Sequence, residues 1–330
     1  MNNKQQVLKT LSDNAVLPII AAPMFLVSSP ELVTACCTNG VIGSFPAPNA
    51  RTIEQLEEWM IHITTALKEH SAIGKTAPWA LNMVTHRTYI RLDEEVELIK
   101  RYQPPIVITA LGSPSTVIEA VHSYDGLVFA DVNSVKFAKK AASTGVDGLI
   151  LVSSGAGGHT GKMNSFAFVE AVRQFFDGII ILAGGISTGN GILAAQSLGA
   201  DLAYMGTSFI SAKESMAQSE YKDMVVDSDY DDILMTDAFT GVHANMLRPS
   251  IVRAGLDPDN LVPKAQIDFS DPQAGTKAWK NIWSAGHGIE SITHIQSAAD
   301  IIKQLHGEYE QAQQQFIDNN PWSTLKEEVK

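Results

Sequence analysis

The chain has 330 residues, of which 45% are hydrophobic and 18% charged, so it can bury the core of one large α/β domain with an insertion. Its formal net charge of −12 argues against a nucleic-acid partner, which would favour a basic face. The sequence shows no membrane helix and no signal peptide, and its two cysteines, Cys36 and Cys37, are adjacent and form no CxxC motif, so we expect a cytoplasmic protein without disulfides.

Short apolar segments rich in β-branched residues alternate with longer helix-like segments. They predict strands at residues 17–21, 41–45, 79–84, 106–110, 127–132, 148–152, 179–183 and 202–205. Helix starts are signalled by Ser29-Pro30-Glu31 and Thr52, and helix ends by Gly40 and Gly199. Eight strand–helix units predict an α/β fold of the (β/α)8 or TIM-barrel type. An open doubly wound sheet is the structural alternative, but it would not require a count of eight.

The strand–helix rhythm ends after Lys213. Residues 214–281 are more polar, and four aspartates fall within residues 227–232, which we interpret as a solvated loop or helix start. No HExxH or comparable spacing indicates a metal site. We predict an FMN-binding barrel formed by residues 1–213 and 282–330, with residues 214–281 inserted as a smaller substrate-side domain over the mouth of the barrel. A helix at 297–316 is expected to pack back onto the barrel.

Glycine-rich and polar residues follow the predicted strands, where a barrel carries its chemistry. The pairs Gly184-Gly185 and Gly206-Thr207 follow the last two strands, a common place for a phosphate site because glycine lets backbone N–H groups approach the oxygens. Alone, Gly184-Gly185 is equally compatible with a tight turn. Together, the two pairs favour phosphate binding.

The loop 155–161 contains four glycines around His159, and such a loop lets the backbone approach a flat ligand. We predict that His159 is functional, as a base or hydrogen-bond donor. His243 and His287 are weaker candidates for the substrate pocket. The remaining histidines considered are expected on the surface or in helices: His62, His70, His86, His122 and His294.

The ordered motifs at residues 18–24, 156–161, 182–186, 199–209 and 283–286 resemble those of the nitronate monooxygenases, over nearly the whole chain. The resemblance implies bound FMN and the oxidation of an alkyl nitronate by O2 to a carbonyl compound and nitrite. His159 would be the catalytic histidine. The residues implied to contact the cofactor are Ala22, Pro23, Met24, Asn82, Asp131, Gly158, Gly184, Gly185, Gly206 and Thr207.

The chain departs from the family pattern at two positions. Many relatives carry Glu where this chain has Gly155, and some carry Lys where it has Asp131. Two other functions remain open at this point. One is an NAD(P)H-dependent flavin reductase of the enoyl-ACP reductase type, which resembles the same loops, and the other is a flavin-free phosphate-binding barrel lyase or isomerase. The partners expected are a small-molecule substrate and O2, with a homodimer as a possible assembly.

Overall fold

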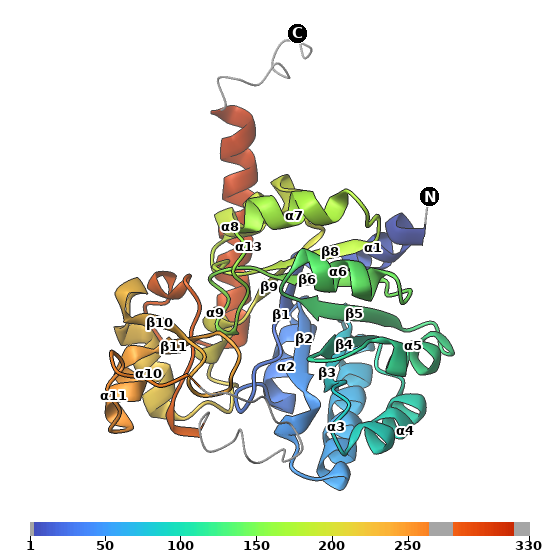
Figure 1. Ribbon diagram of the computed structural model, residues 1–330. Coiled ribbons are helices and arrows are strands. Elements are labelled where there is room, and N and C mark those ends of the chain that lie inside the picture. Colours follow the sequence, from blue (N-terminus) through green and yellow to red (C-terminus); the bar gives the residue numbers. More distant parts are fainter. Residues whose placement is uncertain (1–2, 264–279, 320–330) are drawn as a thin grey trace.

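The computed structural model describes residues 3–263 and 280–319, and its centre is a closed barrel of eight parallel strands (Figure 1). In barrel order these are β1 (Ile19–Ala21), β2 (Ile42–Pro46), β3 (Trp79–Val84), β4 (Ile106–Ala110), β5 (Leu127–Val132), β6 (Gly148–Val152), β8 (Ile179–Ala183) and β9 (Leu202–Met205). β9 pairs with β1 and closes the barrel. The predicted (β/α)8 fold is confirmed.

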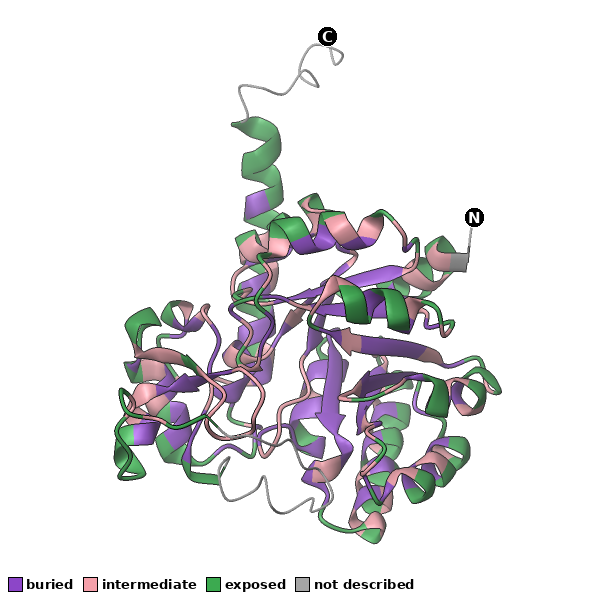
Figure 2. Cartoon of the chain, viewed as in Figure 1, coloured by how far each residue is buried: buried purple, intermediate pink, exposed green. Residues whose placement is uncertain are grey.

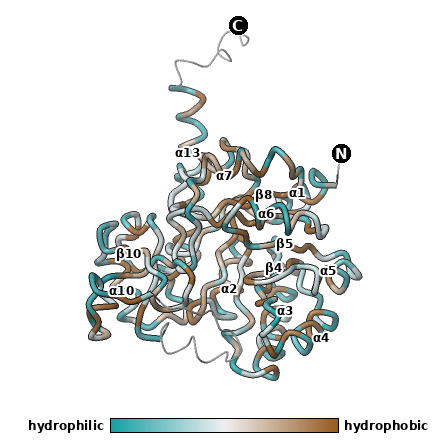
Figure 3. Tube along the Cα trace, viewed as in Figure 1, coloured by the Kyte–Doolittle hydropathy of each residue, from teal (hydrophilic) through white to brown (hydrophobic). Residues whose placement is uncertain are grey.

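The strands are apolar because both of their faces are buried. On β8, Ile179 and Ile181 belong to the apolar cluster inside the barrel, whereas Ile180 and Leu182 belong to the cluster between the strands and the helices. Figure 2 shows the strands as the most continuously buried part of the chain, and in Figure 3 the hydrophobic colour gathers around β8 while the outer helices are more mixed.

Helices cover the outside of the barrel. They are α2 (Pro30–Thr38), α3 (Ile53–Ser71), α4 (Leu92–Tyr102), α5 (Ser115–His122), α6 (Val135–Ala142), α7 (Ser165–Arg173), α8 (Gly189–Ser197) and α13 (Ala298–Asp318). The predicted starts of α2 and α3 are confirmed, because the Ser29 and Thr52 side chains accept hydrogen bonds from the first turn. As expected, α13 packs back onto the barrel, against α8 and α2.

The first helix, α1 (Asn3–Asn14), was not foreseen because its sequence is largely polar. Leu11 is buried, and Val7 and Leu8 are partly buried, against the apolar cluster inside the barrel. This cluster includes Ile20 and Ile106. The helix therefore covers the interior with one narrow apolar stripe, which is too short to stand out from its polar neighbours.

The described part of the inserted segment forms a lobe beside the barrel (Figure 1). It contains α10 (Ser219–Asp227), η2 (Tyr230–Asp232), β10 (Ile233–Thr236), β11 (Ala244–Leu247) and α11 (Arg248–Arg253), and residues 264–279 of the predicted domain lie outside the described residues. β11 pairs with β10 and also with β7 (Gly158–His159), which belongs to the barrel loop after β6. The lobe is thus joined by a sheet to the loop that carries His159.

The aspartate run lies at the start of η2, where the Asp229 side chain accepts a hydrogen bond from the backbone of Asp231. Asp227, Asp229 and Asp231 are exposed, in agreement with a solvated helix start. Within residues 3–263 and 280–319, no group of three or more potential ligands could hold a metal ion. In the same ranges, no helix is long and apolar enough to cross a bilayer.

Candidate active site

A cavity of about 1480 Å³ lies at the carboxyl ends of the barrel strands, and residues at the ends of all eight strands line it. Of the thirteen residues predicted for the site, all except His287 line this cavity. Ligand pockets usually have volumes of roughly 300–1,000 Å³. The cavity therefore has room for a cofactor and a substrate together.

The residues predicted to hold a phosphate lie close together in the loops after β8 and β9. Gly184 has φ +124° and Gly185 φ +69°, both in the region that favours glycine, and a Cβ on Gly184 would overlap the Ser153 hydroxyl. A Cβ on Gly206 would lie 3.5 Å from Met24 Sδ, on the cavity wall. The bare backbone at these positions leaves a shallow cradle that side chains would fill.

Thr207 begins the short helix α9 (Thr207–Ile210) and ties two loops together. Its Oγ1 accepts a hydrogen bond of 2.9 Å from the backbone N–H of Gly286. A threonine hydroxyl that accepts in this way still has its own hydrogen to donate. Thr207 is consequently placed to donate to an anionic oxygen at the cavity edge.

The loop after β1 forms an apolar wall with a fixed shape. Asn49, which is buried, donates to the Met24 carbonyl at 3.0 Å and accepts from the Leu26 N–H at 2.9 Å. The Ser28 hydroxyl accepts from the Met24 N–H at 3.0 Å. These bonds hold Ala22, Pro23 and Met24 against the cavity without help from a ligand.

Two of the four described non-glycine residues with left-handed backbone line the same cavity. Leu26, after β1, has φ 59°, and Leu111, after β4, has φ 63°, and both line the cavity. Left-handed backbone in a leucine costs about 1–3 kcal/mol and persists only where the surrounding structure imposes it. Neither residue could be recognised from the sequence, because leucine has no preference for this conformation.

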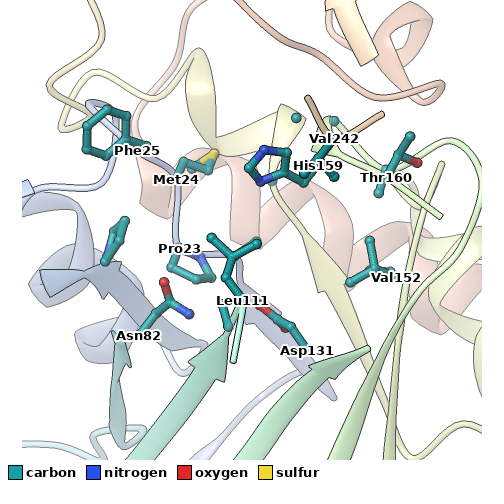
Figure 4. A pocket seen from close by; sticks show the side chains of 18 of the residues that line it. Pro23, Met24, Phe25, Asn82, Leu111, Asp131, Val152, His159, Thr160 and Val242 are labelled. Atoms are coloured by element: carbon teal, nitrogen blue, oxygen red, sulfur yellow. The ribbon is translucent and has the colours of Figure 1, made fainter. Parts of the chain in front are cut away.

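The floor of the cavity is polar, although the barrel below it is apolar. Asn82, Asp131 and Tyr204 line the cavity from β3, β5 and β9, and Figure 4 shows Asn82 and Asp131 at the strand ends, with His159 farther out. The Asn82 Nδ2 donates to the Ile108 carbonyl at 3.3 Å. Sequence analysis missed Tyr204, because an aromatic residue in a strand is ordinarily core.

His159 reaches the cavity because the inserted segment holds its loop. On β7, His159 is aligned with Ala244 of β11, and the Thr160 N–H donates to the His243 carbonyl at 3.0 Å. Its Nε2 lies 3.3 Å from the Thr240 Oγ1. Burial lowers the pKa of His159 from 6.5 to about 4, so the imidazole is neutral at neutral pH.

The Thr240 hydroxyl determines which nitrogen of His159 carries the hydrogen. Thr240 donates its single hydroxyl hydrogen to the Val242 carbonyl at 3.0 Å, since a carbonyl only accepts. The 3.3 Å contact with His159 therefore runs from the Nε2–H to the Thr240 oxygen. The neutral imidazole is the Nε2–H tautomer, and Nδ1 carries the lone pair.

The other predicted histidines lie in different places. His243 lines the cavity, whereas His287 lies behind the glycine loop, its ring edge-on to Tyr230 at 4.9 Å between centroids. A Cβ on Gly155, where φ is +92°, would lie 2.9 Å from the His287 Nδ1. A larger residue at 155 would collide with the His287 ring, which accounts for glycine at this position.

One histidine assignment was wrong. His86 was expected on the surface or in a helix, but it lines the cavity from the loop after β3, with its Nδ1 2.8 Å from the Thr88 hydroxyl. The reason is topological, because the loop after β3 turns over the mouth of the barrel. A histidine that follows a strand of a barrel belongs to the functional face regardless of its sequence neighbours.

Comparisons with known proteins agree with this geometry. A family model described as nitronate monooxygenase matches residues 8–308. A probable nitronate monooxygenase of Staphylococcus saprophyticus is 25% identical, over 89% of this chain and 96% of the relative. A nitronate monooxygenase of Paraburkholderia phytofirmans is 24% identical, over 91% of this chain and 94% of the relative.

Solved structures share the fold. Nitroalkane oxidase from Streptomyces ansochromogenes matches with a TM-score of 0.77 at 22% identity, covering 92% of this chain and 99% of that one. FabK from Thermotoga maritima matches with a TM-score of 0.75, also at 22% identity, covering 94% of this chain and 98% of that one. At this identity the structural matches support the barrel architecture, and the family rests on the match over residues 8–308.

Proposed function

The chain belongs to the nitronate monooxygenase family of flavin-dependent oxidoreductases, and we propose that it uses FMN to oxidise alkyl nitronates with O2 to a carbonyl compound and nitrite. The observation that carries this proposal is that His159, the two glycine pairs and the apolar wall at Met24 all line one cavity. The site would thus combine an anion cradle, an apolar wall and a histidine. We further expect a cytoplasmic protein, with a homodimer as a possible assembly.

The lining of the cavity supports FMN as the cofactor. The side-chain-free backbone at Gly184, Gly185 and Gly206, with the Thr207 hydroxyl, would hold the phosphate. Ala22, Pro23 and Met24 would flank the ring system, with Gly158 on the loop after β6. Asn82 and Asp131 supply polar groups at the floor. When bound, the flavin would supply the redox chemistry.

The residues of the chain prepare the substrate for that chemistry. His159 is neutral in the free protein, so its ring can accept a proton from the carbon beside a nitro group. A nitronate anion beside the ring would stabilise the imidazolium, because opposite charges attract strongly in a buried site. Apolar side chains, including Met24, Phe25 and Val242, line the same cavity and would receive the alkyl group and exclude water.

The test is to mix the purified protein, loaded with FMN, with an alkyl nitronate in the absence of O2 and to record the flavin absorbance. We expect a prompt change in the spectrum, followed by nitrite when air is admitted. A spectrum that ignores nitronate but bleaches with NADH would instead assign a reductase. Protein that takes up no FMN would point to the flavin-free lyase or isomerase.

A further inference from the structure

The side chains that point into the barrel are apolar below the cavity and become polar in the layer next to it. Along β5 the side chains that point into the barrel are those of Leu127, Phe129 and then Asp131, since alternate residues share a face. Phe129 packs with Ile150 and other apolar residues in the cluster that fills the barrel below. Asp131 is therefore the first inward residue of its strand above a dry core.

Asp131 shares this layer with the Tyr204 hydroxyl on β9. Among the described residues, neither Asp131 Oδ1 nor Tyr204 Oη has a hydrogen-bond partner, although both atoms are shielded from solvent. Buried polar atoms are almost always paired, and an unpaired one costs about 1–3 kcal/mol. Both side chains line the cavity, so a bound molecule is the partner that would satisfy them.

The Tyr204 hydroxyl carries its proton at neutral pH, and the Asp131 carboxyl is mostly protonated below about pH 7. Burial raises the pKa of Asp131 from 3.8 to about 7, and burial, followed by the nearby Asp131, raises the pKa of Tyr204 well above its usual value. Burial is the only cause for Asp131, so no charged neighbour is close enough to ionise it. Below about pH 7 the carboxyl group consequently presents mainly an O–H, and not a negative charge, to the cavity.

The surroundings supply no cation to change this state. Arg87, Lys140 and Lys280 line the cavity but are exposed at its rim. Besides Asp131, Tyr204 and the buried Tyr89 and Tyr221, the other titratable side chains lining the same cavity are His86, His159, His243 and Asp237.

We infer that the Asp131 carboxylic acid and the Tyr204 hydroxyl form a proton-donating floor that binds an acceptor atom of the flavin ring system, an oxygen or an unprotonated ring nitrogen. The inference rests on the proposed function, because the ligand it names is the flavin. It adds a role that the apolar wall and the phosphate cradle do not provide. The floor would recognise the flavin ring by its hydrogen-bond acceptors. An ionised Asp131 carboxylate would repel the same acceptor atoms.

The test measures the dissociation constant for FMN, by flavin fluorescence, from pH 6 to pH 8 in the wild type and in Asp131→Asn. Asparagine keeps the size and a donor but does not titrate. With a pKa of about 7, roughly a tenth of Asp131 is protonated at pH 8. The dissociation constant of the wild type relative to Asp131→Asn should therefore rise about tenfold between pH 6 and pH 8. Because both proteins share the phosphate and the histidines, the effect of their ionisation cancels in this ratio.

Two further measurements separate the outcomes. At pH 6, infrared spectroscopy of the wild type should show the C=O stretch of a protonated carboxyl that Asp131→Asn lacks, and Tyr204→Phe should bind FMN more weakly than the wild type at every pH. A ratio that stays constant with pH, or the absence of that band, would overturn the inference while leaving FMN binding intact. A wild type that binds no FMN at any pH would overturn the proposed function and this inference together.

Discussion

Replacing Asp131 by asparagine should make the flavin-free protein more stable, and more so as the pH rises. Below about pH 4 the carboxyl carries its proton in both the folded and the unfolded chain, so it contributes no pH dependence. Between about pH 4 and pH 7 the unfolded chain ionises while the folded protein keeps the proton. Ionisation then favours the unfolded state, and the stability of the wild type falls as the pH rises.

The magnitude follows from the change in pKa. The pKa of Asp131 rises from 3.8 to about 7, and one unit corresponds to about 1.4 kcal/mol. Relative to the wild type, the free energy of unfolding of Asp131→Asn should therefore increase by at most about 4 kcal/mol between pH 4 and pH 8. Above about pH 7 the difference should level off, because both states of the wild type are then ionised.

Urea unfolding followed by circular dichroism, at intervals from pH 4 to pH 8, measures this difference. Asp177→Asn, on the exposed surface, is the control for removing one negative charge and should show no such trend. The low pKa of His159 makes both proteins less stable at acid pH, and it cancels in the comparison. A difference between wild type and Asp131→Asn that does not change with pH would refute the reasoning.

Three further substitutions test the rest of the site. Gly184→Ala should lose about 1–2 kcal/mol of stability and also FMN binding, measured by flavin retention, because its Cβ would overlap the Ser153 hydroxyl. The control Gly145→Ala, at φ +91° in open space, should lose stability alone. Equal FMN binding in both variants would contradict the phosphate cradle. Thr240→Val should lower kcat/KM with a nitronate up to about tenfold and alter its pH profile, because it removes the hydroxyl that contacts the His159 ring. Thr240→Ser should not, and an unchanged profile in Thr240→Val would make Thr240 merely structural. His159→Asn should keep FMN but lower kcat/KM by about 10²–10⁴, and an unchanged value would remove His159 from the mechanism.

Much of the fold followed from local signals. Strands such as β8 are apolar on both faces, and caps such as Ser29 and Thr52 begin their helices, so both could be recognised from a few neighbouring residues. α1 escaped because its apolar stripe is narrow. The pairing of β7 with β11 escaped for a different reason, since it joins residues about 85 positions apart and β7 has only two residues.

For the candidate active site as well, local features could be predicted from the sequence and long-range contacts could not. The sequence by itself determined that glycine pairs follow the last two strands and that His159 stands in a glycine-rich loop, because barrel topology sends all such strand ends to one face. Only the tertiary structure decided that His287 lies behind that loop while His86 faces the cavity. The same holds for the placing of Asp131 and Tyr204 in one layer and for the tautomer of His159, since each depends on segments that the sequence keeps far apart. Protonation depends on burial, and burial belongs to the folded chain as a whole.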